Sequence, residues 1–368
     1  MKKTLKNAKG ITLVALVITI IILLILATIS IQSLTNTGLF KNAEKAREET
    51  NKATENQEKR LNEYEDEINK YVSGTTQTQK LADKVKVGDY VTYTPDTLTN
   101  TDAKYTTLIS NLGTYSGSTA NTASTLTQES LKWRVLDVQN GQVRLISEVP
   151  TTSKITLQGY NGYNNAVKLL DDTCNTLYNN SKLASKVQNL KIEDITAYMK
   201  TQPKEDTTEY KTTNINYPKI LEQEENQTVE NSVTNNKLGV SEQHNFVTTG
   251  KATSATSTLK KTYWYKSMTS EDFNNSKYYE LLINNGSDYS AYWMSSRCVN
   301  AYSYNASSNG ADFGVSYVAS GRVRGSSLCY FDGIEYPGNC AFRPCITLNS
   351  NVQVTSGSGS PESPFNIQ

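Results

Sequence analysis

Residues 133–150, WRVLDVQNGQVRLISEVP, carry the clearest local fold signal in the chain. Two runs rich in apolar residues flank the dipeptide Asn140-Gly141. This dipeptide favours a two-residue hairpin turn, because both of its residues tolerate positive φ. The stretch therefore predicts a β-hairpin. Further along the chain, short apolar runs punctuated by glycine recur between residues 289 and 348, and they predict several more strands.

Two amphipathic segments after this hairpin predict helices. The first spans residues 164–180 and the second residues 190–199. The apolar residues expected to face the core at helical spacing are Val167, Leu170, Cys174 and Leu177 in the first helix, and Ile192, Ile195 and Met199 in the second. Each helix also carries adjacent carboxylates, which are typical of exposed helix faces: Asp171-Asp172 and Glu193-Asp194. Strands and helices together predict an α+β fold.

The composition of the 368-residue chain narrows the function classes. A formal charge of +1 gives no global field that would favour nucleic acid. The single histidine, His244, argues against His-based metal sites or catalysis, and the cysteine spacings match no zinc pattern. Five cysteines are an odd number, so at least one thiol stays unpaired, although a Cys340–Cys345 bridge is one alternative. We expect no metal and no cofactor. The 23 tyrosines, with abundant Ser, Thr, Asn and Gly, are typical of adaptable recognition surfaces.

The N-terminal region contains a long apolar segment. Residues 11–31 carry no charge, and as a helix they would extend roughly 31 Å, enough to cross a bilayer core. The segment is longer than the apolar region of an ordinary secretion signal. Four lysines precede it: Lys2, Lys3, Lys6 and Lys9. This charge predicts a single-pass membrane protein with a cytoplasmic N-terminus and its globular part on the cell surface.

A charged segment, residues 32–73, follows and predicts a helical stalk. Its only regular apolar seam is formed by Leu61, Tyr64, Ile68 and Tyr71. Two interpretations stay open: the seam packs against another part of the protein or a partner helix, or the segment is a solvated spacer. The predicted organisation is a leader at 1–10, a transmembrane helix at 11–31, the stalk at 32–73, a linker at 74–84, a globular domain at 85–350 with polar inserts near 94–130 and 200–262, and a tail at 351–368.

The junction before the apolar segment, KGITL at residues 9–13, resembles the processing site of type IV prepilins. The resemblance implies that a prepilin peptidase cleaves between Gly10 and Ile11 and leaves Ile11 as an N-methylated terminus. The family usually has Glu at the fifth mature position, where this chain has Ala15. Without that carboxylate, a terminal charge would enter a filament core uncompensated, which is costly. Ala15 therefore disfavours filament assembly, and a plain membrane anchor is the alternative.

Further blocks of sequence extend the resemblance. In order, they are WRVLDV, GYNGYNNAVKLLDDTCNTLYNN, LKIEDI, YWMSSR, FGVSYVASGRV and FRPCITL. Together with the leader they resemble a family of pilin-like surface proteins from clostridia and related anaerobes. The resemblance implies a long N-terminal transmembrane and stalk helix followed by a mixed α/β, C-type lectin-like domain. Some lectin-fold members are variable proteins of diversity-generating retroelements, which randomise template adenines.

Residues 298–333 fit such a variable region. They lack Lys, Glu, Gln, Met and Trp, the residues that randomised AAY codons cannot encode. The predicted ligand-binding residues are Asn300, Tyr302, Tyr304, Asn305, Tyr317, Arg322, Arg324, Ser326, Tyr330 and Phe331. The predicted scaffold consists of Phe313, Val315 and Val323 facing inward, Gly314, Gly321 and Gly325 at turns or close approaches, and the core residues Trp293 and Leu348. The alternative is an ordinary loop region of a β-rich domain.

These observations predict a membrane-anchored, pilin-like surface display protein that binds an external protein or glycan non-covalently. The ligand would lie on another cell, a phage or a host. The alternative is a structural or minor type IV pilin or pseudopilin subunit. An enzyme is not expected, because the sequence shows no phosphate-binding loop and no G-x-S-x-G or H-E-x-x-H motif. Other expected partners are the membrane, the prepilin peptidase, and pilin subunits or further copies of the chain.

Overall fold

The computed structural model describes residues 79–121, 126–218, 239–247, 251–284, 291–305 and 308–368, with isolated positions between 45 and 60. The chain divides into two compact units, Met1–Gln77 and Thr78–Gln368. The described positions between 45 and 60 are helical. The predicted leader, the apolar segment 11–31 and the rest of the predicted stalk lie outside the described residues, as do Gly10, Ile11 and Ala15.

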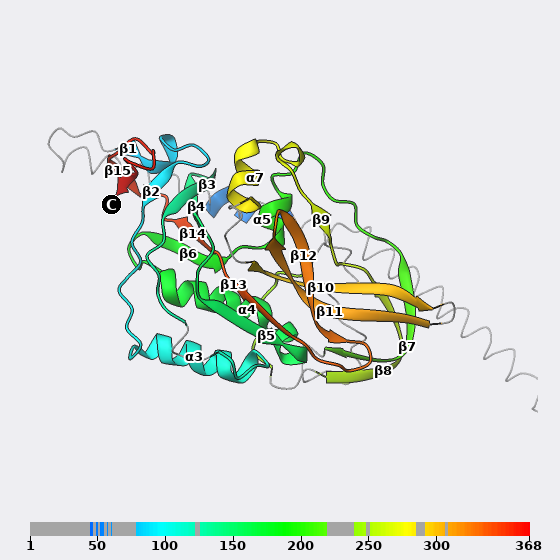
Figure 1. Ribbon diagram of the computed structural model, residues 1–368. Helices are drawn as coiled ribbons and strands as arrows, with labels where there is room; N and C mark the ends of the chain where they lie inside the picture. Colours follow the sequence, from blue (N-terminus) through cyan, green and yellow to red (C-terminus); the bar gives the residue numbers. More distant parts are fainter. Residues whose placement is uncertain are drawn as a thin grey trace, which may run out of the picture. The chain divides into compact units, whose positions relative to one another are not determined.

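The second unit is dominated by β-sheets (Figure 1). In its described part, the larger sheet has eight strands in the order β1-β15-β16-β2-β3-β4-β14-β6. Their bounds are β1 Gln79–Lys80, β2 Tyr90–Thr92, β3 Trp133–Gln139, β4 Gln142–Ser147, β6 Ala184–Asn189, β14 Pro344–Leu348, β15 Gln353–Ser356 and β16 Phe365–Ile367. The first and last described strands of the unit, β1 and β16, therefore lie in the same sheet.

A second sheet has six strands in the order β5-β13-β10-β11-β12-β9, and β7 pairs with β8 separately. The bounds are β5 Lys154–Gln158, β7 Glu209–Pro218, β8 Lys251–Lys260, β9 Lys266–Ser267, β10 Tyr292–Asn305, β11 Ser308–Ala319, β12 Arg322–Tyr330 and β13 Pro337–Ala341. Figure 1 shows β10 and β11 as a long hairpin whose far end lies beside β7. This hairpin carries half of the predicted ligand-binding residues, and β12 carries most of the others.

The described residues of this unit contain few helices. They are η1 Leu81–Asp83, α3 Ala103–Tyr115, α4 Gly159–Tyr178, α5 Ile192–Thr196, η2 Ser270–Asp272 and α7 Ser276–Leu282. Helix α4 packs against β6, β10 and α3. Its apolar face joins a core cluster that also contains Val135 of β3, Leu145 of β4 and Phe313 of β11. The helix therefore ties the two large sheets to one core.

The predicted fold class is wrong. The prediction was an α+β fold with a long N-terminal transmembrane and stalk helix followed by a mixed α/β, C-type lectin-like domain. Over the described residues the protein is instead mostly β-sheet with few short helices. Among the described residues no helix has both the length and the apolar character needed to span a bilayer. The prediction underestimated the sheet content because polar segments rich in Thr, Ser and Asn pair as strands. These segments lack the alternation of apolar and polar residues by which a strand is recognised in a sequence.

Three stretches predicted to be polar excursions, inserts or a tail contain regular secondary structure: residues 94–130, 200–262 and 351–368. The first stretch, predicted as a polar excursion, contains helix α3. The second, predicted as a polar insert, contributes strands β7 and β8, which pair from Glu209↔Lys260 to Pro218↔Lys251. The third, predicted as a tail, supplies β15 and β16, and β16 pairs in parallel with β2. Backbone pairing orders the strands of the last two stretches, although their side chains carry little hydrophobic signal.

Several local predictions are confirmed. Strands β3 and β4 form the expected hairpin, and its turn residues Asn140 and Gly141 have φ of 49° and 75°, as a two-residue primed turn requires. The helix predicted at 164–180 is α4, although it begins five residues earlier, at Gly159. The predicted core residues are all buried: Val167, Leu170, Cys174, Leu177, Ile192, Ile195, Met199, Trp293, Phe313, Val315, Val323 and Leu348.

The adjacent carboxylates were predicted on exposed helix faces, and this is right for only one of each pair. Asp172 forms a partly exposed ion pair with Lys168 on the helix surface. Asp171, however, is 3% exposed, and Asp194 is 7% exposed and bonded to Arg144. A helical pattern does not show that polar partners from distant segments will surround one carboxylate.

Candidate functional site

The predicted ligand-binding residues lie on three neighbouring strands. Strand β11 pairs with β10 on one side and with β12 on the other, antiparallel in both cases. Asn300, Tyr302, Tyr304 and Asn305 belong to β10, Tyr317 to β11, and Arg322, Arg324, Ser326 and Tyr330 to β12, while Phe331 follows β12 directly. The side chains of Tyr304 and Asn305 lie outside the described part of the protein.

The structure does not bring these residues into one site. Tyr330 and Arg322 are the two ends of β12, so at 3.3 Å per residue they lie about 26 Å apart along the strand. Asp312 and Tyr317 are five residues apart on β11, so strand alternation directs their side chains to opposite faces. We therefore distinguish two groups: the acid end (Asn300, Tyr302, Asp312, Tyr330 and Tyr336) and the arginine end (Tyr263, Tyr265, Tyr317, Arg322 and Arg324).

The acid end is centred on a carboxyl group. Asn300, Asp312 and Tyr330 occupy directly opposed positions on β10, β11 and β12, so their side chains share one face. The Tyr302 hydroxyl donates a hydrogen bond to Asp312 Oδ1 at 3.1 Å. Asn300 also hydrogen-bonds this carboxyl group. The hydrogen-bonding groups of Asn300, Asp312 and Tyr302 therefore lie on paired strands, and the strand register sets their relative positions.

Burial shifts the pKa values of Asp312 and Tyr302, the hydrogen-bonded pair at the centre of this cluster. The pKa of the Asp312 carboxyl is raised, because burial outweighs the hydrogen bonds from Tyr302 and Asn300, and Asp332 adds repulsion. The pKa of Tyr302 is also raised, first by burial and then by the charge of Asp312. Tyr302 therefore remains a neutral phenol at physiological pH, which suits hydrogen bonding and not nucleophilic attack.

Aromatic rings border this carboxyl group. The rings of Tyr330 and Tyr336 are 4.9 Å apart between centroids and tilted by 48°. Tyr336 is 42% exposed and its neighbour Ile334 is 49% exposed. Gly310 leaves room for two rings, since a Cβ at this position would lie 2.9 Å from Phe331 and 3.1 Å from Tyr302. The acid end therefore combines exposed ring surface with a polar centre.

The arginine end combines tyrosines with guanidinium groups. Arg322 Nη1 donates to the Tyr265 hydroxyl at 3.0 Å, and the Arg324 guanidinium lies over the Tyr265 ring at 5.5 Å from its centroid. Tyr317 is opposite Arg324 in register and hydrogen-bonds its side chain, which raises the pKa of Arg324. The Tyr317 ring also packs edge-on against Trp293 at 6.1 Å. Contacts with tyrosines therefore restrain the side chains of both Arg322 and Arg324.

The remaining predicted residues are less available. Ser326 is half-buried opposite Val315, and its Oγ lies close to Gly338 of β13. Phe331 is half-buried, and its carbonyl accepts hydrogen bonds from the backbone and side chain of Asn216 on β7. Both residues therefore contribute to packing between strands.

The predicted glycines in this region behave as expected. A Cβ on Gly314 would collide with the Ser326 carbonyl oxygen, and one on Gly325 would collide with the Tyr263 ring. Gly321 has φ of 71° and follows Ser320 with φ of 50°, so the β11–β12 connection is another two-residue primed turn. The strands can approach closely only because these positions lack side chains.

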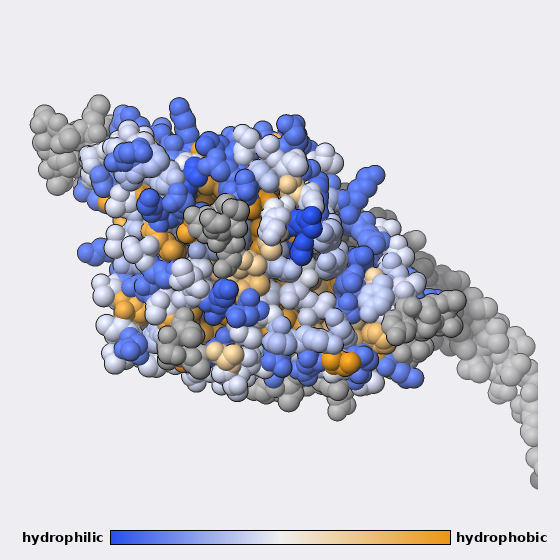
Figure 2. Space-filling view, viewed as in Figure 1, coloured by the Kyte–Doolittle hydropathy of each residue, from blue (hydrophilic) through white to orange (hydrophobic). Residues whose placement is uncertain are grey.

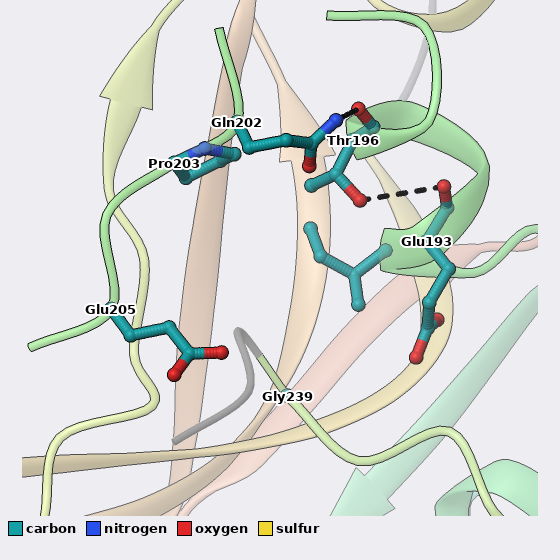
Figure 3. A pocket seen from close by; sticks show the side chains of 7 residues that line it. Glu193, Thr196, Gln202, Pro203, Glu205 and Gly239 are labelled. Atoms are coloured by element: carbon teal, nitrogen blue, oxygen red, sulfur yellow. Dashed lines mark hydrogen bonds between the residues drawn. The ribbon is translucent and has the colours of Figure 1, made fainter.

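A pocket of about 170 Å³ lies elsewhere, beside α5 (Figure 3). It is lined by Ile192, Glu193, Thr196, Gln202, Pro203, Glu205 and Gly239. Gln202 donates to the Thr196 carbonyl at 2.7 Å, and Glu193 already accepts a hydrogen bond from Ser241 at 2.7 Å. No predicted ligand-binding residue lines it. Its two carboxylates are exposed to solvent and do not by themselves define a site.

The cysteines are buried, and the histidine is half-buried. All five cysteines are buried and free. Cys340 and Cys345 do not form a disulfide, and they belong to two different core clusters. Burial raises the pKa of both Cys298 and Cys340 to about 12, so these groups stay as thiols. Burial also lowers the pKa of His244, whose Nδ1 lies 2.6 Å from the Asn245 carbonyl. Within the described ranges, no cluster of three His, Cys, Asp or Glu side chains could hold a metal ion.

Four residues of the two groups are not among the ligand-binding residues predicted from the sequence. Tyr336 lies three residues beyond the segment 298–333, and Tyr263 and Tyr265 lie earlier in the chain. Asp312 lies inside the segment. Exposed tyrosines flanking the segment were the available signal, whereas the pairing of Asp312 with Asn300 depends on register. No protein-family model, curated protein or solved structure matches the chain.

Proposed function

We propose that this protein is a pilin-like surface display protein that binds a saccharide non-covalently through the acid end of the β10–β12 strands. The apolar segment 11–31 would anchor it in the membrane, with its globular unit on the cell surface. The observation that carries the proposal is the half-buried Asp312 carboxyl, held by Tyr302 and Asn300 and bordered by exposed rings.

The chemistry of this cluster fits a polyhydroxylated ligand. Tyrosine offers a stiff, amphipathic contact surface at low entropy cost, and a sugar ring can stack its apolar face on it. Asp312 and Asn300 have further capacity to accept and donate hydrogen bonds to hydroxyl groups. On the visible face of the protein, apolar residues are scattered among hydrophilic ones (Figure 2). This distribution supports recognition by small polar sites over a broad hydrophobic interface.

The test compares two exposed tyrosines in the full-length chain. Tyr336→Ala and Asp312→Asn are each expected to weaken binding to neutral oligosaccharides, screened on an array and measured by calorimetry, by about tenfold or more. Tyr265→Ala is the matched control, because Tyr265 is 51% exposed but belongs to the arginine end. Equal losses in all three variants, or no neutral saccharide bound by the unaltered chain, would refute the proposal.

Diversification of this surface is a separate part of the proposal. The exposed and half-exposed positions of 298–333 would vary, while Cys298 and Cys329, at 2% and 0% exposure, would stay constant because side chains buried there cannot contact a ligand. Sequencing the encoding locus tests this. The expected result is a near-copy of codons 298–333 that differs at adenines, beside a reverse transcriptase. A locus without such a copy would leave an undiversified binding surface.

A further inference from the structure

We infer that the arginine end is a second binding site, which accepts a carboxylate carried by an acidic saccharide. This inference rests on the proposed function in one respect: both sites belong to strands proposed to bind saccharides. It differs in position and in chemistry, because the arginine end lies at the opposite end of β12 and carries cationic groups. The two sites can therefore be tested separately.

In the described part of the protein, the polar partners of Arg322 and Arg324 are tyrosines and not carboxylates. Among the described residues, neither Arg322 nor Arg324 forms an ion pair with a carboxylate, whereas Lys266, opposite Val323 on β9, pairs with Asp272 at 2.6 Å. The Nε of Arg324 is buried and has no hydrogen-bond partner within the described structure. Because this Nε is buried, it offers no donor to a ligand, and bidentate recognition of a carboxylate would use the terminal nitrogens of the two half-exposed arginine side chains.

The geometry holds the two guanidinium groups for a shared ligand. Arg322 and Arg324 alternate on β12, so their side chains leave the same face about 7 Å apart. Tyr265 contacts both of them, through its hydroxyl and through its ring. Tyr265 thus restrains both guanidinium groups before a ligand binds. The loss of side-chain entropy on binding an anion would therefore be small.

Tyrosines select a sugar-borne anion over a bare ion. Tyr265 is 51% exposed, and Tyr263 and Tyr317 are half-exposed beside the arginines. Phenol hydroxyls can hydrogen-bond sugar hydroxyls, and the exposed ring offers stacking surface. An isolated phosphate or sulfate ion would use the guanidinium groups and none of this aromatic surface.

The experiment uses the full-length chain in detergent with a matched pair of ligands: an oligogalacturonate and its methyl ester, which keeps the rings but removes the charge. Calorimetry should detect the acid form, with affinity falling as salt concentration rises, and should show at least about tenfold weaker binding of the ester. Arg322→Ala combined with Arg324→Ala should abolish the preference. Arg322→Lys combined with Arg324→Lys should recover only part of the preference, because a lysine ammonium cannot donate two parallel hydrogen bonds to a carboxylate as a planar guanidinium can.

Controls separate this inference from the proposed function. Lys104→Ala combined with Lys182→Ala removes two exposed positive charges on α3 and before β6, and it should leave oligogalacturonate binding unchanged. Tyr336→Ala should do the same, while reducing neutral saccharide binding. Equal affinity for the acid and the ester would overturn the inference. So would a loss of oligogalacturonate binding in the Lys104→Ala and Lys182→Ala control equal to that in the arginine variant. Tighter binding of a poly-glutamate peptide or of inorganic phosphate than of oligogalacturonate would also overturn it.

Discussion

Replacing Asp171 with alanine is expected to lower the free energy of unfolding by about 3–5 kcal/mol. The Asp171 carboxylate accepts hydrogen bonds from Asn189 N at 3.0 Å, Ser295 Oγ at 2.8 Å and Gln243 Nε2 at 2.6 Å. Lys191 Nζ lies 3.3 Å from it. The substitution removes the carboxylate partner of Lys191, whose side chain is only 18% exposed. It also leaves the three hydrogen-bond donors without this acceptor. Urea unfolding followed by circular dichroism measures the loss.

The adjacent residue is a matched control for this prediction. Asp172 is on the same helix and pairs with Lys168 at 2.9 Å, with both side chains about one-third exposed. Asp172→Ala should therefore change stability by no more than about 0.5 kcal/mol. Similar effects of the two substitutions would contradict the assignment of Asp171 to a buried network. The comparison keeps charge, residue type and helix constant, so it isolates burial.

Replacing Arg343 with methionine is expected to destabilise the protein by about 3 kcal/mol. Arg343 has no exposed surface. Its guanidinium donates to the Ser147 carbonyl at 3.0 Å and to the Glu148 carbonyl at 2.9 Å, and lies 5.3 Å from the centroid of the Tyr292 ring. Methionine fills part of the space but cannot donate to the two carbonyl oxygens. Relief of the desolvation cost of a buried cation offsets only part of that loss.

Arg343→Lys distinguishes shape and charge in this site. A lysine keeps the positive charge but cannot reach two carbonyl groups with a planar fork, so it should restore less than half of the lost stability. Thermal unfolding of both variants beside Lys182→Met, an exposed substitution, provides the measurement. A loss below about 1 kcal/mol for Arg343→Met would show that the buried guanidinium does not stabilise the contact between the residue before β14 and the end of β4.

The two charged networks also explain where sequence-based prediction stopped. Asp171 and Asp172 are adjacent carboxylates on one amphipathic helix, and no local pattern separates them. Only the approach of Asn189, Gln243 and Ser295, between 18 and 124 residues away, makes one of them a buried acceptor. The same holds for the candidate site. Tyrosine and arginine composition identified the strands, whereas strand register decided that Asp312 meets Asn300 while Arg324 meets Tyr317.

The sequence by itself determined the local features whose signals are short-range. The Asn140-Gly141 turn requires positive φ, the buried face of α4 follows helical spacing, and the glycines of β11 and β12 mark close approach. Tertiary structure alone decided the sheet-dominated fold, because strands such as β7, β8, β15 and β16 are ordered by backbone pairing with distant segments. It also divided one predicted binding face into two ends. Register and the rise along a strand are collective properties, and no single stretch of sequence specifies them.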